Sequence, residues 1–459
     1  MATARANSRP ARVFQSRVVE PLQAFMRTET SAGIVILVGA VIALVWANSP
    51  WRESYFEFWE REVVIRLLAL EFDHHLSDFV NDALMVLFFF MVGLEIKREL
   101  VHGQLASPRR AALPVIAAAG GMIVPAAIYL TLNGGGEYRH GWGIPVATDI
   151  AFAVGVLALV GSRAPFSLKV FLLAIAVADD LGGILVIALF YSEGIALVPL
   201  LVAAAVAATI FALNRLGVRS LVIYALLGLV MWAAVFESGI HATIAGVILA
   251  LLTPAAPYYS REEFERSLNP LVEEFHAAVE ADDEERQQGV LSEIERLARE
   301  TESPLDRLEH QLAPWVSFVI VPIFALANAG VHVSGEALSA AVESPVAIGV
   351  ALGLFLGKPI GILLATFLAV RLGVAALPSG ARWGQILGVG LLGGIGFTVS
   401  LFITGLAFEP GLIQDEAKMG ILAGSLLSGV VGYAYLRFGP ATKSVPQERA
   451  VPEPAAGSG

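Results

Sequence analysis

The chain has 459 residues, of which 56% are hydrophobic and only 15% are charged, and its mean hydropathy is +0.71. This composition is far too apolar for a soluble protein of this length, so it excludes a soluble enzyme and indicates a polytopic membrane protein. The sequence contains no cysteine, which excludes disulfides and thiolate metal sites. The formal net charge of −11 arises almost entirely between residues 261 and 310, so it indicates no nucleic-acid partner.

Apolar segments long enough to cross a bilayer follow one another along the chain. We expect twelve transmembrane helices, at about residues 31–48, 76–99, 111–132, 142–161, 167–191, 196–213, 219–236, 240–256, 313–331, 345–370, 383–407 and 417–437. Lys and Arg are enriched in alternate short loops, which by the positive-inside rule predicts both termini on the cytoplasmic side. The expected fold class is an all-α polytopic membrane protein, with a single transmembrane transporter domain at 31–438.

The two ends of the chain differ from this domain in composition. Residues 1–30 contain several arginines and predict a basic cytoplasmic N-terminal segment. Residues 439–459 are rich in proline and polar residues, which predicts a disordered C-terminal tail.

Two segments between the expected spans are predicted to lie outside the membrane. Residues 51–72 alternate aromatic or aliphatic with charged side chains, which is typical of a short β-hairpin. Packing on the membrane surface and a contact between two copies of the chain fit this hairpin equally, because exposed strand edges pair readily. Residues 257–312 predict an acidic, solvated, cytoplasmic helical insert, with sixteen acidic and six basic residues between Arg261 and His310.

Ionisable side chains occur inside the apolar segments, where each one is energetically costly. Asp179 and Asp180 are adjacent in the fifth expected span, and Asp149 follows Thr148 in the fourth. Lys358 stands in the middle of the tenth span, too far from either end for its side chain to reach the interface comfortably. Such residues are typical of cation and proton pathways, so we interpret them as a candidate binding site.

Helix-breaking residues interrupt two of the expected spans. The fourth contains Pro145 shortly before Asp149, and the eleventh contains Gly393, Gly394 and Gly396. These spans are the middle members of two three-span units, spans 3–5 and 10–12, which enter the membrane from opposite sides. Corresponding broken helices in inverted repeats are typical of transporter sites, where free carbonyls and carboxylates bind a small cation such as Na+ or Li+.

Several short motifs occur in a characteristic order and spacing. They are Asn81-Asp82-Ala83-Leu84, Val92-Gly93-Leu94-Glu95-Ile96-Lys97-Arg98-Glu99-Leu100, Ala147-Thr148-Asp149, Ala178-Asp179-Asp180-Leu181, Ser238-Gly239-Ile240-His241-Ala242-Thr243, Gly357-Lys358-Pro359 and Gly394-Ile395-Gly396-Phe397-Thr398. Together they resemble the bacterial NhaA-type sodium/proton antiporter family over about residues 20–438. The resemblance implies crossing broken helices four and eleven, no cofactor, a location in the bacterial inner membrane, and a homodimer joined through the hairpin at 51–72.

The activity that this resemblance implies is electrogenic, pH-regulated exchange of Na+ or Li+ for periplasmic protons. Matched one position at a time, Asp180 corresponds to the principal cation-binding carboxylate and Asp179 to the second essential one, so both would bind the transported Na+ or Li+. Lys358 corresponds to the partner of Asp179. Asp149 and Thr148 correspond to the unwound segment whose charge compensates the helix ends.

Another group of residues matches positions linked to the pH response at the cytoplasmic funnel. These are Glu95, Arg98, Glu99, Glu309 and His310, and His241 joins them as a candidate pH sensor. Surface ion pairing at helical spacing alone would explain the first three, and an ordinary interface position explains His241 equally well. Ala313 stands where well-studied members have a second histidine, and the acidic insert is longer than usual, which leaves the set point of pH activation open.

Two close carboxylates cannot both ionise cheaply at low dielectric, so the sequence predicts exchange by competition between cation and protons. It leaves open whether Asp179 or Lys358 carries the second proton. A sodium-coupled carrier of organic anions would share the architecture, but few other polar side chains are available to line a cavity. An intramembrane aspartyl protease with Asp149 and Asp180 as its dyad is a further alternative, although neither lies in a Gly-X-Gly-Asp pattern.

Overall fold

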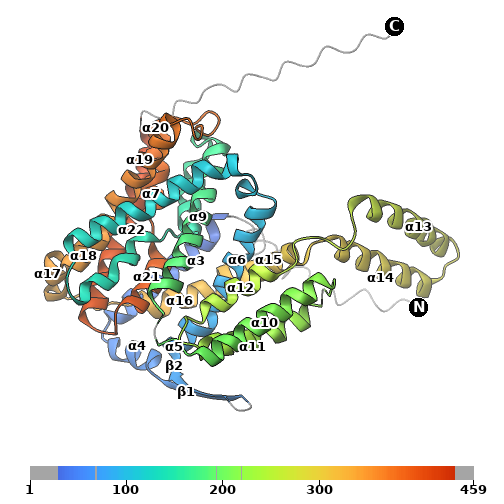
Figure 1. The fold of residues 1–459 in the computed structure, drawn as a ribbon, viewed down its shortest axis with the longest axis horizontal. Coiled ribbons are helices and arrows are strands. Elements are labelled where there is room, and N and C mark those ends of the chain that lie inside the picture. The colour runs from blue at the N-terminus through green and yellow to red at the C-terminus, as the bar shows by residue number, and fades with distance from the viewer. Residues whose placement is uncertain (1–28, 68–69, 193, 219, 440–459) are drawn as a thin grey trace, which may run out of the picture.

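The computed structural model describes residues 29–67, 70–192, 194–218 and 220–439. Figure 1 shows them as a bundle of helices with a two-stranded ribbon at one edge. The basic segment expected at 1–30 and the tail expected at 439–459 lie almost entirely outside the described residues.

Seven helices in the described ranges are long and apolar enough to cross a membrane. Four of them are uninterrupted α-helices: α7 (Pro108–Leu132), α9 (Phe166–Phe190), α10 (Leu197–Arg215) and α22 (Leu412–Phe438). Three are continuous helices with one π-turn each: α5 (Leu76–Phe79), η2 (Val80–Leu84) and α6 (Met85–Val101); α15 (Pro304–Trp315), η6 (Val316–Ile320) and α16 (Val321–Asn328); and α18 (Pro345–Leu352), η7 (Gly353–Gly357) and α19 (Lys358–Arg371). A π-turn closes i→i+5 hydrogen bonds and frequently occurs at functional sites.

Three further helix pairs are long enough only when each bent pair is taken as one span. They are α3 (Glu29–Ala47) with α4 (Arg52–Trp59), bent by 118°; η4 (Glu137–Val146) with α8 (Ile150–Val160), bent by 40°; and α20 (Trp383–Gly393) with α21 (Phe397–Ala407), bent by 47°. Two shorter apolar helices are α11 (Leu221–Phe236) and α12 (Thr243–Leu252). The multi-pass helical fold is confirmed, with seven to ten spans by length and composition in this part of the chain, whereas the number twelve stays a prediction.

The extramembrane hairpin is shorter and later in the chain than the sequence predicted. Helix α4 occupies Arg52–Trp59, because Tyr55 and Trp59 are four positions apart and share one buried helical face. The Tyr55 hydroxyl fixes this helix to the bundle by donating to the carbonyl of Leu326 at 2.8 Å. The strands that do form are β1 (Glu62–Leu67) and β2 (Leu70–His75), which pair antiparallel. The hairpin expected at 51–72 is therefore corrected to 62–75.

The acidic insert folds as two helices that pack against each other and project away from the bundle at the right of Figure 1. They are α13 (Arg261–Glu280) and α14 (Glu284–Thr301). Ser260 caps α13: its backbone N–H and its hydroxyl hydrogen-bond the Glu263 carboxylate and hold the pKa of Glu263 below its usual value. Residues 304–312, expected to belong to the insert, instead begin α15, because Ser303 caps the helix and Pro304 suits its first position.

Glycine permits direct backbone contact between α7 and α19, which belong to the two three-span units expected from the sequence. A Cβ added to Gly120 of α7 would collide with the carbonyl of Gly361 of α19, and one added to Gly361 would collide with the carbonyl of Gly120. Close approach of small residues is a principal source of helix association in membranes. The units α7–α9 and α18–α22 thus pack together, and their relation by inverted symmetry stays a prediction. Short connecting elements are η3 (Gln104–Ala106), η5 (Gly161–Arg163) and α17 (Gly335–Glu343).

Candidate cation site

The breaks in the two interrupted helices meet at Asp149. Its backbone N–H donates to the carbonyl of Ile395, at an N to O distance of 2.6 Å. One carboxylate oxygen caps α8 by accepting from Phe152 N–H at 3.1 Å, and the other accepts from the Thr398 N–H at 3.1 Å and hydroxyl at 2.5 Å. Helix N-termini carry free N–H groups and partial positive charge, so the carboxylate stabilises both α8 and α21.

Asp179, Lys358 and Thr148 form a second buried group. Lys358 of α19 is 0% exposed and Asp179 of α9 is 1% exposed, and their side chains form an ion pair. The Thr148 hydroxyl lies 2.6 Å from the same Asp179 oxygen, 2.9 Å from the Lys358 ammonium nitrogen and 2.8 Å from the carbonyl of Gly393. The other Asp179 carboxylate oxygen is buried without a hydrogen-bond partner in the described part of the chain. Asp179 is therefore engaged through one oxygen only.

Asp180 has different surroundings from its neighbour, because adjacent residues on a helix point about 100° apart. It lines a cavity of about 170 Å³ together with Glu95, Asp149, Thr148 and Thr398. Within the described ranges, its carboxylate has no hydrogen bond or ion pair to another residue. The two adjacent aspartates are thus distinct: one is paired with Lys358, and the other faces a cavity with its oxygens available.

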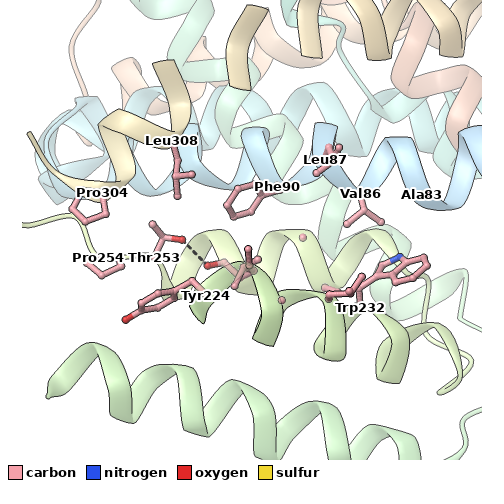
Figure 2. A pocket seen from close by; sticks show the side chains of 16 residues that line it. Ala83, Val86, Leu87, Phe90, Tyr224, Trp232, Thr253, Pro254, Pro304 and Leu308 are labelled. Atoms are coloured by element: carbon pink, nitrogen blue, oxygen red, sulfur yellow. Dashed lines mark hydrogen bonds between the residues drawn. The ribbon is translucent and has the colours of Figure 1, made fainter. Parts of the chain in front are cut away.

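A larger cavity between α6, α11, α12 and α15 provides a contrast. Figure 2 shows its lining, with Phe90 and Leu87 from α6 opposite Tyr224 and Trp232 from α11. Its volume is about 390 Å³, and no carboxylate lines it. A bare cation would lose its hydration there without receiving charged oxygen ligands in exchange. Of these two cavities, only the one at Asp180 has the chemistry of a cation site.

Of the candidate pH-response residues on α6, Arg98 and Glu99 lie beyond the Asp180 cavity, toward the end of the helix. Arg98 forms an ion pair with Glu309 of α15, and its guanidinium lies 4.0 Å from Glu95. Glu99 instead accepts a hydrogen bond from the backbone N–H of Gln104, at 2.8 Å. Glu95 is the one member of this group that also lines the Asp180 cavity.

The two candidate histidines lie apart from one another. His310 on α15 has Nδ1 3.0 Å from the Glu302 carboxylate, close to the acidic insert. His241 has Nε2 3.5 Å from Asp82, near the opposite end of the α5–α6 helix, and Nδ1 2.9 Å from the Thr243 hydroxyl. The structure therefore does not assemble His241 with the other pH-response candidates.

Sequence reasoning missed three polar groups at or near the site. The Ser425 hydroxyl of α22 accepts from the N–H groups of Gly396 and Phe397, each at 3.2 Å, and so supports the break before α21. Lys97 donates to the carbonyls of Leu251, at 2.7 Å, and Thr253, at the end of α12. Ser317 lines the Asp180 cavity. Lys97 stands in a recognised motif, whereas a lone serine in an apolar span gives no sequence signal.

Two broken helices that meet in an apolar bundle beside buried carboxylates define the chain as a secondary ion transporter by architecture. Residues 23–436 match the family model described as Na+/H+ antiporter 1. The chain belongs to this family, and it is accordingly a transporter and not an enzyme. Of the functions that the sequence left open, antiport of sodium and protons is the one that family membership confirms.

Similar proteins include several named as antiporters. One from Syntrophobacter fumaroxidans, named Na(+)/H(+) antiporter NhaA, is 47% identical over 92% of this chain and 91% of its own length. The protein of the same name from Koribacter versatilis is 49% identical over 91% of each chain. Na(+)/H(+) antiporter NhaA 2 from Sorangium cellulosum is 44% identical over 93% of this chain and 91% of its own. A solved structure, the sodium proton antiporter MjNhaP1 from Methanocaldococcus jannaschii, is 15% identical over 93% of this chain and 95% of that chain with a TM-score of 0.47, too distant a likeness to support a conclusion.

Proposed function

We propose that this antiporter binds Na+ or Li+ at Asp180 and exchanges the cation for protons by competition at the Asp179 and Asp180 carboxylates. The observation that carries the proposal is the difference between these neighbours. Asp180 faces a cavity with no protein partner in the described ranges, whereas Asp179 is held by Lys358 and Thr148. A cation entering the cavity therefore meets a free carboxylate.

Competition follows from the cost of charge in a low-dielectric bundle. Two nearby carboxylates repel one another when both are ionised, so in the absence of a cation a proton stabilises the pair. A cation needs the bare carboxylate oxygens, so its binding releases that proton. Cation and proton consequently exclude each other from the site, and reorientation of the loaded site completes one half of the exchange.

The Asp179 and Lys358 pair provides the second titrating group. One Asp179 oxygen accepts from the Lys358 ammonium group and becomes available to the cation only when Lys358 withdraws, whereas the other oxygen has no hydrogen-bond partner in the described part of the chain. Either Asp179 or Lys358 then carries the second proton of the cycle. More than one proton per Na+ makes the exchange electrogenic, at about 2.3 kcal/mol per charge for each 100 mV of membrane potential.

Regulation by pH is proposed to act through the ion pair that links α6 to α15. Arg98 on α6 contacts Glu309 on α15. Helix α6 contributes Glu95 to the wall of the Asp180 cavity, and the turn η6, which directly follows α15, contributes to the same wall. Protonation of a carboxylate in this group would weaken the pair and let the two helices shift. Access to Asp180 would change with the shift.

The remaining features of the proposal concern assembly and location. We place the protein in the bacterial inner membrane with both termini cytoplasmic, because alternate short loops are rich in Lys and Arg. We place a homodimer contact at the β1–β2 hairpin, since a two-stranded ribbon has free edges that can pair. Inorganic cations and protons are the transported species, and no cofactor takes part in the proposed cycle.

Transport by purified protein in liposomes containing a pH-sensitive dye tests the proposal. Wild-type protein should move protons when Na+ or Li+ is added, but not when K+ or an organic anion is added. Asp180→Asn should abolish this response, because the amide cannot exchange the cation for a proton. Glu336→Gln, on the exposed face of α17, is the matched control and should retain it. Cation-driven proton movement in Asp180→Asn would overturn the assignment, and rates that ignore an imposed membrane potential would overturn electrogenic exchange.

A further inference from the structure

The Asp180 cavity contains a hydroxyl group that competition between cation and protons at the aspartates does not require. Ser317, in the π-turn η6, lines this cavity with Glu95, Asp149 and Asp180. A helical serine or threonine commonly donates to a carbonyl about one turn earlier. Thr209 does so to Ala205 at 2.8 Å, for example. The Ser317 hydroxyl, in contrast, has no hydrogen bond to any residue that the structure describes.

The Ser317 backbone carbonyl also lacks its usual hydrogen-bond donor, because of the π-turn. Val321 N–H donates to the carbonyl of Val316, five residues earlier, rather than to that of Ser317. The next residue, Pro322, has no N–H to donate. Ser317 therefore has two oxygens that lack their ordinary helical partners, at a turn whose type is frequent at functional sites.

A cation at Asp180 needs such neutral oxygens. Small hard cations take several oxygen ligands, and Asp180 can supply at most two. Both oxygens of Asp149 already accept hydrogen bonds from Phe152 or Thr398. Glu95 also lines the cavity and lies 4.0 Å from the Arg98 guanidinium, whereas Asp179 does not line it and is paired with Lys358 through one oxygen. The carboxylates in the cavity therefore leave part of the coordination shell to water or to neutral protein groups.

We propose that Ser317 supplies an oxygen ligand to the Na+ or Li+ held at Asp180 and thereby sets the apparent affinity for the transported cation. The inference deepens the proposed function and rests on the role given there to Asp180. Ser317 carries no charge and exchanges no proton, so its contribution belongs to cation binding and not to the coupling of cation and proton.

Initial rates of Na+-driven proton movement in liposomes, measured over a range of Na+ concentrations, separate these two contributions. Ser317→Ala should raise the KM for Na+ about fivefold, the effect of losing one neutral polar contact, with the maximal rate within about twofold of wild type. Ser317→Thr keeps the hydroxyl and should restore the wild-type KM. Thr209→Val, which removes a hydroxyl from an exposed position of α10, is the matched control. An unchanged KM in Ser317→Ala would overturn the proposal.

A second readout does not depend on transport. The sequence contains no cysteine, so Ser317→Cys introduces a single thiol of nearly the same size. Sulfur is a poor ligand for hard cations, so this variant should bind Na+ as weakly as Ser317→Ala. Na+, but not K+, should slow the reaction of this thiol with a small methanethiosulfonate reagent in the purified protein. Equal labelling rates in both salts would overturn the role of Ser317 as a ligand. Such a result would leave the role of Asp180 intact, because that role is tested separately by the loss of exchange in Asp180→Asn.

Discussion

Replacing Lys358 with methionine would leave the Asp179 carboxylate buried without its cation. Lys358 is 0% exposed and Asp179 is 1% exposed, so water cannot take over the role of the ammonium group. Removing one partner of such a buried pair costs about 3–5 kcal/mol, because the remaining charge is uncompensated. The Thr148 hydroxyl, 2.6 Å from the carboxylate, offsets a small part of this cost. We expect Lys358→Met to lower the free energy of unfolding by about this amount at neutral pH.

The measurement is a double-mutant cycle of thermal unfolding in detergent, with Lys358→Met, Asp179→Asn and the double variant. The double variant should be more stable than the sum of the single losses predicts, since neither of its side chains leaves a charge unpaired. Lowering the pH should narrow the gap between Lys358→Met and wild type, because protonation of Asp179 removes the unpaired charge. Additive losses, or a gap that does not depend on pH, would refute the reasoning.

Three further predictions concern packing, assembly and regulation. Gly361→Val should destabilise the contact of α7 with α19 by at least about 1–3 kcal/mol and reduce the yield of folded protein on gel filtration, whereas Gly289→Val, where a Cβ meets nothing, should not. Deletion of residues 62–75 should convert a dimer to a monomer in detergent while exchange activity persists, and an unchanged dimer would reject the hairpin contact. Glu309→Gln removes the ion-pair partner of Arg98 and should shift the pH at which transport begins, unlike Glu336→Gln; an unshifted profile would remove the pair from the regulatory proposal.

Most of the membrane architecture could be predicted because bilayer thickness fixes the length of an apolar helix. By the same criterion α11 and α12 are too short to count as spans, so the two spans expected there stay predictions. Helix-breaking residues did locate the interruptions at Asp149 and at Gly394, since glycine and proline act locally. Contacts between distant segments decide which groups meet at those interruptions, and a single sequence does not show such contacts. The pairing of Asp179 with Lys358 was expected from the family resemblance, and the structure contains it as an ion pair.

The errors have equally specific causes. The aromatic residues around Tyr55 alternate with charged ones, which suggested a strand, but Tyr55 and Trp59 also fit one face of a helix. The end of the insert was placed too late because polar residues 304–312 belong to an amphipathic start of a spanning helix. Ser317 was missed because its importance depends on a π-turn and on neighbours from other helices, neither of which leaves a local pattern in the sequence.

The hydrogen bonds of Asp149 have a mechanical consequence. They tie the start of α8 and the start of α21 to a single side chain, and hydrogen bonds to a charged group contribute about 1.5–3 kcal/mol each. Pulling the two half-helices apart would break several of them at once and leave a carboxylate bare in the bundle. These hydrogen bonds hold the two half-helices in a fixed relative position. We therefore expect any motion that exposes the site to the other side of the membrane to move both half-helices together as one rigid body.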